Sequence, residues 1–223
     1  MEGRMAEKKE LKSLGYEIFI GVLSILSILN LILAVFIPDP DLTQVLNIMN
    51  WLFSIIFIID FIYRILTAPS KSNYFFRQFG WADLLASLPF EQTKILRIFR
   101  LVRVYRLMRE VGPKKVADTL LKDRAGSALI ILLLMGILVL EFGSLAILRA
   151  EEANPEANIK TASDAIWYTM VTISTVGYGD RYPTTGSGRI IGALIIIIGV
   201  GIFGTFTGYL ANLFLSPQKK EES

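Results

Sequence analysis

The chain contains no cysteine and no histidine among its 223 residues. These two absences exclude a disulfide within the chain, a thiolate nucleophile and a zinc site of the usual cysteine and histidine type. They also exclude Ser–His and Cys–His catalytic pairs, and no other catalytic constellation is visible. We therefore expect that the protein is not an enzyme and needs no cofactor.

Charged residues are scarce, at 19% of the chain, whereas hydrophobic residues make up 53%. This balance indicates a membrane protein. Four long segments are almost free of charge, namely residues 16–37, 45–67, 127–148 and 190–215. Each is long enough to span a bilayer as a helix. The first segment is too long for a secretory signal peptide and no small-residue cleavage site follows it, so we expect it in the mature protein.

Basic residues gather in the N-terminal tail, in residues 111–125 and in the C-terminal tail. By the positive-inside rule, all three regions are expected in the cytoplasm. Two termini on one side of the membrane require an even number of crossings. Two further crossings, or none, must then lie between Thr67 and Val111, where residues 76–90 and 94–110 form two weakly hydrophobic segments.

Residues 94–110 carry a cation at every third position, separated by apolar or aromatic pairs. These cations are Lys94, Arg97, Arg100, Arg103, Arg106 and Arg109. On an α-helix, each cation lies about 60° behind the previous one around the helix axis, because three residues fall short of a full turn. On a 3₁₀ helix, the cations would align on one face. Three other interpretations of this repeat are a helix on the membrane surface, a basic helix that binds nucleic acid or calmodulin, and an ordinary solvated helix face. Each of them predicts other polar residues among the arginines. The nearly pure arginine pattern favours a segment within the bilayer, and no nucleic-acid partner is expected.

Arginines within a bilayer need partners, because each unpaired arginine near the centre costs about 2.5–3.5 kcal/mol. Asp60 and Asp83 are carboxylates within or beside apolar segments. Asp60 can also pair with Arg64, which lies four residues further along the same helix face. Asp83 has no such neighbour, so we predict that a cation meets it.

Residues 172–180 read Thr-Ile-Ser-Thr-Val-Gly-Tyr-Gly-Asp. Because glycine enters left-handed conformations freely, its alternation with Val176 and Tyr178 allows successive carbonyls to point the same way, and we expect a positive φ at Gly177. With the Thr175 hydroxyl, such carbonyls form rings of oxygen atoms if several chains surround one axis, and these rings can replace the hydration shell of a monovalent cation. One chain supplies only part of each ring, so an oligomer is predicted. A simple Gly-Tyr-Gly turn is the alternative.

The chain resembles the six-segment voltage-gated potassium channels over almost its whole length. The resemblance rests on the run Thr172–Asp180, on the arginine repeat and on three weaker matches: Phe57-x-x-Asp60-x-x-x-Arg64, Asp83 followed by Pro89, and Asp164-Ala-Ile-Trp167. It implies an all-α membrane protein that forms a homotetramer. Each chain would contribute six transmembrane helices, a re-entrant pore helix and a selectivity filter.

The resemblance also implies an order of parts along the chain. The parts are a cytoplasmic tail at 1–15, a four-helix voltage-sensing domain at 16–110, a linker helix at 111–125, a pore domain at 126–215 and a second cytoplasmic tail at 216–223. Residues 163–174 are too short to span a bilayer and fit the pore helix. The expected location is the plasma membrane, crossed several times, with both termini in the cytoplasm.

Roles for individual residues follow from the same resemblance. The filter would consist of Thr175, Val176, Gly177, Tyr178 and Gly179, and the backbone carbonyls of the first four would hold K⁺. Asp180, Trp167 and Tyr168 would support the filter, although the family often has a second tryptophan in place of Tyr168. The six cations of the repeat would sense voltage and pass a charge-transfer site made of Phe57, Asp60, Asp83 and Arg64.

Three further positions belong to gating and block. Gly199 and Gly208 would form the hinge of the gate. The alternative for Gly199 is close helix packing through small residues, and Gly204 and Gly208 match the Gly-x-x-x-Gly spacing of such packing. Tyr182 would ring the outer mouth, where a quaternary ammonium ion or a peptide toxin binds, or it would serve only as an interfacial anchor.

The expected function is a potassium-selective channel that opens on depolarisation, with K⁺ as the permeant ion and anionic lipids around it. One alternative is a constitutive or otherwise gated K⁺ channel with a vestigial sensor. Another is an ion transporter, which the single copy of the filter sequence disfavours.

Overall fold

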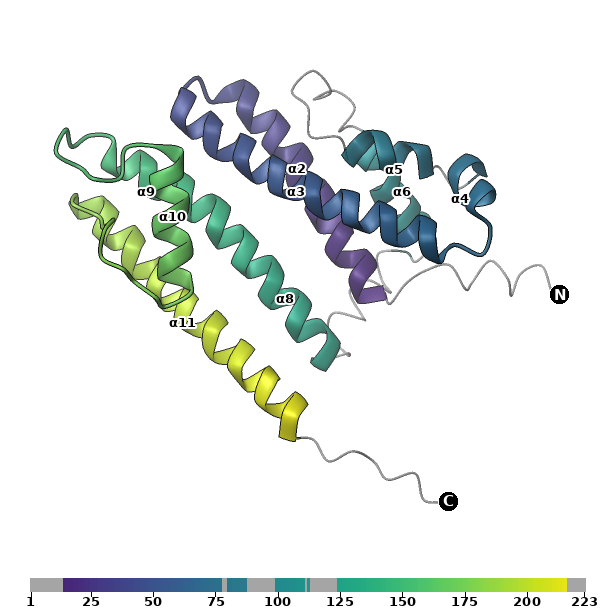
Figure 1. Ribbon diagram of the computed structural model, residues 1–223. Helices are drawn as coiled ribbons and strands as arrows, with labels where there is room; N and C mark the ends of the chain where they lie inside the picture. The colour runs from purple at the N-terminus through teal and green to yellow at the C-terminus, as the bar shows by residue number, and fades with distance from the viewer. Residues whose placement is uncertain (1–13, 78–79, 88–98, 111, 113–123, 216–223) are drawn as a thin grey trace. The chain divides into compact units, whose positions relative to one another are not determined.

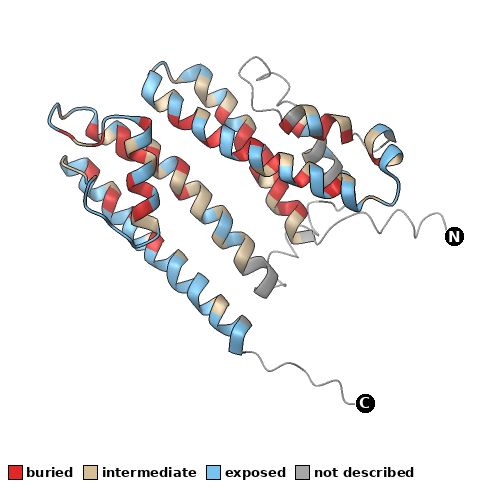
Figure 2. Ribbon diagram, viewed as in Figure 1, coloured by how far each residue is buried: buried red, intermediate tan, exposed pale blue. Residues whose placement is uncertain are grey.

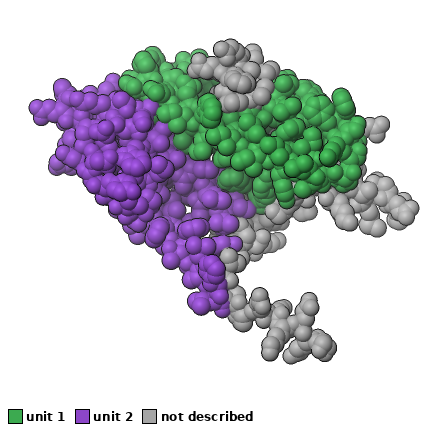
Figure 3. All heavy atoms as spheres, in the orientation of Figure 1, with its two compact units in different colours: residues 1–127 green, residues 128–223 purple. Residues whose placement is uncertain are grey.

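The computed structural model describes residues 14–77, 80–87, 99–110, 112 and 124–215, and the regular structure of these residues is entirely helical. The chain divides into two compact units, Met1–Ser127 and Ala128–Ser223 (Figure 3). Within the described part, the helices long and apolar enough to cross a membrane are Gly15–Phe36, Pro40–Thr67, Leu129–Glu151 and Gly186–Asn212. The four predicted apolar spans are thereby confirmed. Almost all of the predicted tails and of the linker helix lies outside the described residues.

The first unit is built on a hairpin of two long helices, α2 (Leu14–Phe36) and α3 (Pro40–Thr67), drawn in purple and blue in Figure 1. Asp39 caps α3, because its carboxylate accepts a hydrogen bond from the Leu42 N–H at 2.9 Å. Pro40 follows at the start of the helix, where its missing N–H would have no partner in any case. The sharp turn therefore holds the two helices side by side.

Three shorter helices complete the first unit: α4 (Lys71–Arg77), α5 (Gly80–Ser87) and α6 (Arg100–Glu110). Helix α5 packs against α3, α4 and α6, and helix α6 packs against α2. None of the three reaches the length of a membrane span as described, and residues 88–98 lie outside the described part. The two further transmembrane helices expected over 76–90 and 94–110 stay a prediction.

The second unit contains one long helix interrupted by a π-helical turn, in the order α8 (Arg124–Leu138), η3 (Val139–Gly143) and α9 (Ser144–Glu151). Two further helices follow, α10 (Ala162–Ile173) and α11 (Gly186–Leu215). The short helix α10 packs against η3, α9 and α11 (Figure 1). Its span agrees with the pore helix predicted over 163–174, whose role stays a prediction.

Apolar side chains are distributed differently in the two units. In the first unit, buried residues gather along the facing sides of α2 and α3, coloured red in Figure 2. Helix α11 is mostly exposed, and its Ile190, Ile197 and Phe214 side chains are 67%, 68% and 81% accessible. An exposed apolar surface of this extent indicates contact with lipid or with another protein.

Candidate functional site

The segment that follows α10 has an alternating backbone. Thr175, Gly177 and Gly179 have positive φ angles of 59°, 53° and 79°, whereas the intervening Val176 and Tyr178 do not. Alternation between left-handed and right-handed regions is what allows successive carbonyls to turn to one side of a strand. The positive φ expected at Gly177 is observed.

Thr175 also has a positive φ, which sequence reasoning missed because a β-branched residue is rare in that region. Backbone hydrogen bonds hold the strand in place. The Thr175 N–H donates to the Thr172 carbonyl at 3.0 Å, and the Val171 carbonyl accepts from Val176 at 3.0 Å and from Gly177 at 3.1 Å. The last turn of α10 thus imposes a strained conformation on the start of the strand, which is typical of functional segments.

Trp167 connects α10 to the segment that follows it through a hydrogen bond and a stacking contact. Its indole Nε1–H donates to Asp180 Oδ2 at 2.9 Å, and its ring stacks on Tyr178 with centroids 5.7 Å apart and 4° between the planes. Tyr168 is buried and packs toward α11, where a Cβ added at Gly192 would lie 2.6 Å from the tyrosine hydroxyl. Two of the predicted support residues therefore contact each other, and the third packs on α11.

The beginning of α10 is tied to the residue after Asp180. Thr161 and Asp164 form a capping box, in which each side chain accepts a hydrogen bond from the other residue's backbone N–H at 3.2 Å. Asp164 Oδ1 also pairs with Arg181 Nη2 at 2.9 Å. Desolvation raises the pKa of Asp164, but hydrogen bonds from Lys160 and Thr161 and the nearby Arg181 charge outweigh it and leave the pKa below its usual value. The Thr-x-x-Asp spacing signals the cap, whereas nothing in the sequence signals the ion pair.

Glu151 fastens the connection that leads into α11. The side chain is fully buried, and it accepts hydrogen bonds from the N–H groups of Thr184 at 2.8 Å and Thr185 at 2.9 Å and from both hydroxyls. A carboxylate at the beginning of a helix is favoured by the helix dipole and by such charge-assisted bonds. The adjacent Glu152 is instead exposed and pairs with Arg149. Sequence reasoning did not separate the two glutamates, because they are neighbours in one acidic pair.

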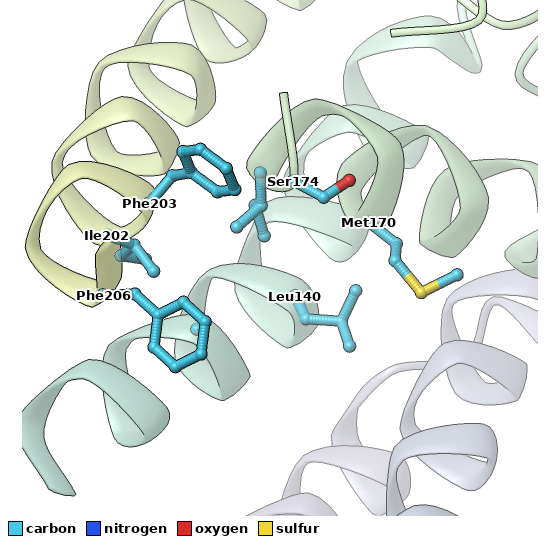
Figure 4. A pocket seen from close by; sticks show the side chains of 8 residues that line it. Leu140, Met170, Ser174, Ile202, Phe203 and Phe206 are labelled. Atoms are coloured by element: carbon cyan, nitrogen blue, oxygen red, sulfur yellow. The ribbon is translucent and has the colours of Figure 1, made fainter. Parts of the chain in front are cut away.

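An apolar pocket of about 260 Å³ lies within the second unit, below the end of α10 (Figure 4). Its lining comes from α8, η3, α10 and α11, with Leu140, Met170, Ser174 and Phe206 among the side chains shown. No ion-binding or polar cluster marks it. Sequence reasoning did not predict it, since uniformly apolar helices give no signal of where a pocket forms between them.

The first unit carries a buried face along α3 that is polar or charged except for one aromatic residue. Its members recur every three or four residues and face the same way: Asn50, Ser54, Phe57, Asp60 and Arg64. Arg100, the first residue of α6, is 2% accessible and lies over the Phe57 ring, 4.5 Å from the centroid. Its Nη2 donates to the Ser54 hydroxyl at 3.2 Å. A predicted sensor cation and a predicted charge-transfer aromatic are therefore in contact.

Arg64 is held by carboxylates from two helices. Its Nε pairs with Asp60 Oδ1 and its Nη2 pairs with Glu17 Oε2, each at 2.8 Å. The Tyr16 hydroxyl donates to the same Asp60 oxygen at 2.5 Å. The local Asp60–Arg64 pair that the sequence left open is observed. Glu17 was missed, because it lies 47 residues before Arg64 at the edge of an apolar run.

Asp83 is buried on α5 and accepts a hydrogen bond from the Tyr74 hydroxyl at 3.0 Å. A phenol therefore meets this carboxylate, and the cation predicted there stays a prediction. Among the remaining cations, Lys94 and Arg97 lie outside the described residues. Arg103 and Arg106 lie within α6 without a description of their side chains, and Arg109 is exposed.

Of the positions predicted for gating and block, Tyr182 and Gly208 are exposed in the second unit, whereas Gly199 is buried. Tyr182 is 56% accessible, and its N–H donates to Asn158 Oδ1 at 3.2 Å. Helix α11 is continuous through Gly199 and Gly208. A Cβ added at Gly199 would lie 2.9 Å from the Ile173 Cα, so this glycine also allows α10 and α11 to approach closely. The hinge role stays a prediction.

Replacing Glu17 with glutamine is expected to lower the free energy of unfolding by about 1–3 kcal/mol, because the buried Arg64 loses one charged partner. The measurement is denaturant or thermal unfolding of the purified protein in detergent. Glu152→Gln is the matched control, since it breaks an exposed pair worth about 0–1 kcal/mol. A loss at Glu17 no larger than that at Glu152 would contradict the importance of the buried pair.

Comparison with known proteins supplies the family. The profile of the ion transport protein family matches residues 13–222. The voltage-gated potassium channel regulatory subunit KCNF1 of Homo sapiens is 25% identical over 164 residues, which are 65% of this chain and 33% of the relative. A voltage-gated potassium channel of Aeropyrum pernix is 36% identical over 78 residues, 35% of this chain and 26% of the relative. A putative potassium channel protein of Rhodopseudomonas palustris is 27% identical over 195 residues, 78% of this chain and 47% of the relative.

The matched regions thus cover from 26% to 47% of these curated relatives. The resemblance to voltage-gated potassium channels found in the sequence is confirmed by these matches. Together with the membrane-length helices, they identify a multi-pass membrane protein. The chain belongs to the ion transport protein family and is similar, within that family, to voltage-gated potassium channels.

Proposed function

We propose that four copies of the chain surround one potassium-selective pore, which opens when the membrane is depolarised. The observation that carries this proposal is the alternating sign of φ over Thr175–Gly179. A strand with carbonyls on one side can contribute to rings that replace the hydration shell of K⁺. The carbonyls of Thr175, Val176, Gly177 and Tyr178 would hold the permeant ion, and no other cofactor is required.

The exposed apolar surfaces support an assembly of several copies. In the single chain, the Val176 and Tyr178 side chains are 54% and 68% accessible, although both are large and apolar for the most part. Packing against neighbouring copies around an axis would cover them, together with part of α11. We propose a homotetramer in the plasma membrane, with both termini in the cytoplasm and anionic lipids at the inner surface.

The buried face of α3 supports voltage sensing. Moving one elementary charge through the membrane field changes the energy by about 2.3 kcal/mol per 100 mV. If each of four subunits moves about three charges, the total is roughly 28 kcal/mol per 100 mV, which is ample to open a pore. Arg100 lies over the Phe57 ring, 4.5 Å from the centroid, and a cation–π contact of this kind contributes about 0.5–2 kcal/mol. A predicted sensor cation thus lies beside the aromatic of the proposed charge-transfer site.

The test is current through planar bilayers that contain the purified protein, recorded with voltage steps in K⁺ and then in Na⁺. We expect a K⁺ current whose open probability rises with depolarisation, and little Na⁺ current. Comparable currents in both ions would contradict the filter assignment. A K⁺ current independent of voltage would instead support a constitutive or otherwise gated channel with a vestigial sensor.

Tyr182→Thr is expected to weaken external block by tetraethylammonium at least tenfold, or about 1.4 kcal/mol. Four phenol rings around one axis would offer their π electrons to the quaternary ammonium ion, each contact contributing roughly 0.5–2 kcal/mol. The measurement is the dose dependence of block in bilayers. Tyr182→Phe keeps the ring and should keep the block. Equal affinities in the wild type and Tyr182→Thr would leave this residue as an interfacial anchor.

A further inference from the structure

The two charged residues that follow Gly179, Asp180 and Arg181, are each bound by a side chain of α10. Asp180 accepts a hydrogen bond from the Trp167 indole at 2.9 Å, and Arg181 Nη2 pairs with Asp164 Oδ1, also at 2.9 Å. Asp164 and Trp167 are three residues apart, so they are neighbours on the surface of the helix. Helix α10 therefore determines where both charges at the end of this segment lie.

The Asp164 carboxylate is held in place independently of Arg181. Its Oδ2 atom accepts hydrogen bonds from the backbone N–H groups of Lys160 and Thr161, each at 3.2 Å. These bonds use one carboxylate oxygen and leave Oδ1 for the guanidinium. The Asp164 side chain is 17% accessible and that of Arg181 is 38% accessible, so water reaches the cation more easily than the anion. The beginning of α10 thus presents a fixed anion to a more exposed cation.

This ion pair has more effect on the position of a charge than on stability. A pair that is partly open to water contributes little to the free energy of folding. The guanidinium stays positively charged in proteins, and arginine has a long side chain with many rotamers. Without the Asp164 carboxylate, the Arg181 charge would no longer be neutralised by its partner or held beside α10.

The position of the Arg181 charge has a consequence in the proposed tetramer. Arg181 lies two residues beyond Gly179, the last residue of the proposed filter, so four copies would surround the outer mouth. A charge near the mouth changes the local concentration of permeant ions, and four uncompensated cations would repel K⁺ there. The pairing of each Arg181 with an anion on α10 removes this repulsion.

We propose that Asp164 holds the Arg181 guanidinium away from the pore axis, and that this ion pair thereby sets the rate at which K⁺ enters the filter from outside. This inference rests on the proposed function, because only a tetrameric pore gives Arg181 an axis to face. Asp164 is a positioning residue, since it acts on K⁺ through Arg181. A pair that merely fastened the segment to α10 would have no such electrostatic effect.

The experiment measures single-channel K⁺ currents in planar bilayers. In about 10 mM K⁺, Asp164→Asn is expected to lower the inward current about threefold and the outward current less, because charges at the outer mouth are poorly screened at low salt. Asparagine keeps an acceptor for the Thr161 N–H but loses the charge that holds Arg181. Addition of an impermeant organic salt to about 1 M shortens the Debye length from about 30 Å to about 3 Å and should remove most of the difference.

Arg181→Gln identifies the charge that is responsible. Added to Asp164→Asn, it should restore the inward current to the wild-type level, and alone it should not lower that current. Glu156→Gln is the matched control, because it removes one negative charge from the same loop before α10, where the Glu156 side chain is exposed. The inward current of this control should stay close to that of the wild type.

Equal losses of current in Asp164→Asn, in Arg181→Gln and in the double variant would show that the pair only fastens the segment, and would overturn the inference. A deficit that Glu156→Gln reproduces, or that salt does not reduce, would also overturn it. If Asp164→Asn does not assemble, Arg181→Glu decides: it is expected to raise the inward current at low salt, and an unchanged or smaller current would contradict the proposal. All these outcomes leave the channel function intact, whereas a wild-type protein without K⁺-selective current would overturn both proposals.

Discussion

Gly177→Ala is expected to abolish potassium-selective current. Gly177 has a φ of 53°, and no atom is found within 4 Å of an added Cβ in the single chain, so the damage within the chain comes from backbone strain. Holding alanine in the left-handed region costs about 1–2 kcal/mol, or roughly 4–8 kcal/mol over four subunits. Thr175 already occupies the same region with a β-branched side chain, so the strand has little tolerance for more strain.

The measurement is the ratio of K⁺ to Na⁺ permeability in bilayers that contain the purified variant. Gly136→Ala is the matched control, because no atom lies within 4 Å of its added Cβ either and its backbone is that of an ordinary helix. Alanine is about 1 kcal/mol better than glycine inside a helix, so this control should conduct normally. A normal permeability ratio in Gly177→Ala would refute the filter assignment.

Arg100→Gln is expected to flatten the dependence of open probability on voltage. The side chain is 2% accessible and lies over the Phe57 ring, where water does not screen the membrane field. If about three charges move in each subunit, removal of one lowers the slope by roughly a third. The slope is read from conductance–voltage curves and, independently, from gating currents.

Arg100→Lys is the control for this experiment, because it keeps the charge and loses the planar fork of donors. It should keep the slope and shift only the midpoint. A wild-type slope in Arg100→Gln would favour the alternative in which the arginine repeat is a vestige in a pore gated by other means.

The sequence alone was sufficient to predict those features of this protein that depend on residues close together in the chain. The four apolar spans follow from hydropathy and length alone, because a helix that crosses a bilayer needs a continuous apolar run. The positive φ of Gly177 follows from the conformational freedom of glycine. The Asp60–Arg64 pair follows from a spacing of four residues on one helix.

The tertiary structure alone decided the contacts that cross between helices. Glu17 meets Arg64, and Arg100 meets Phe57 and Ser54, because particular faces of α2, α3 and α6 pack together. Helical periodicity shows that a face exists but does not show which face of another helix it meets. In the second unit, Glu151 and Glu152 have almost the same sequence context, yet one is buried and binds the two residues before α11, whereas the other is exposed. Burial separates such neighbours, since successive residues on a helix point about 100° apart.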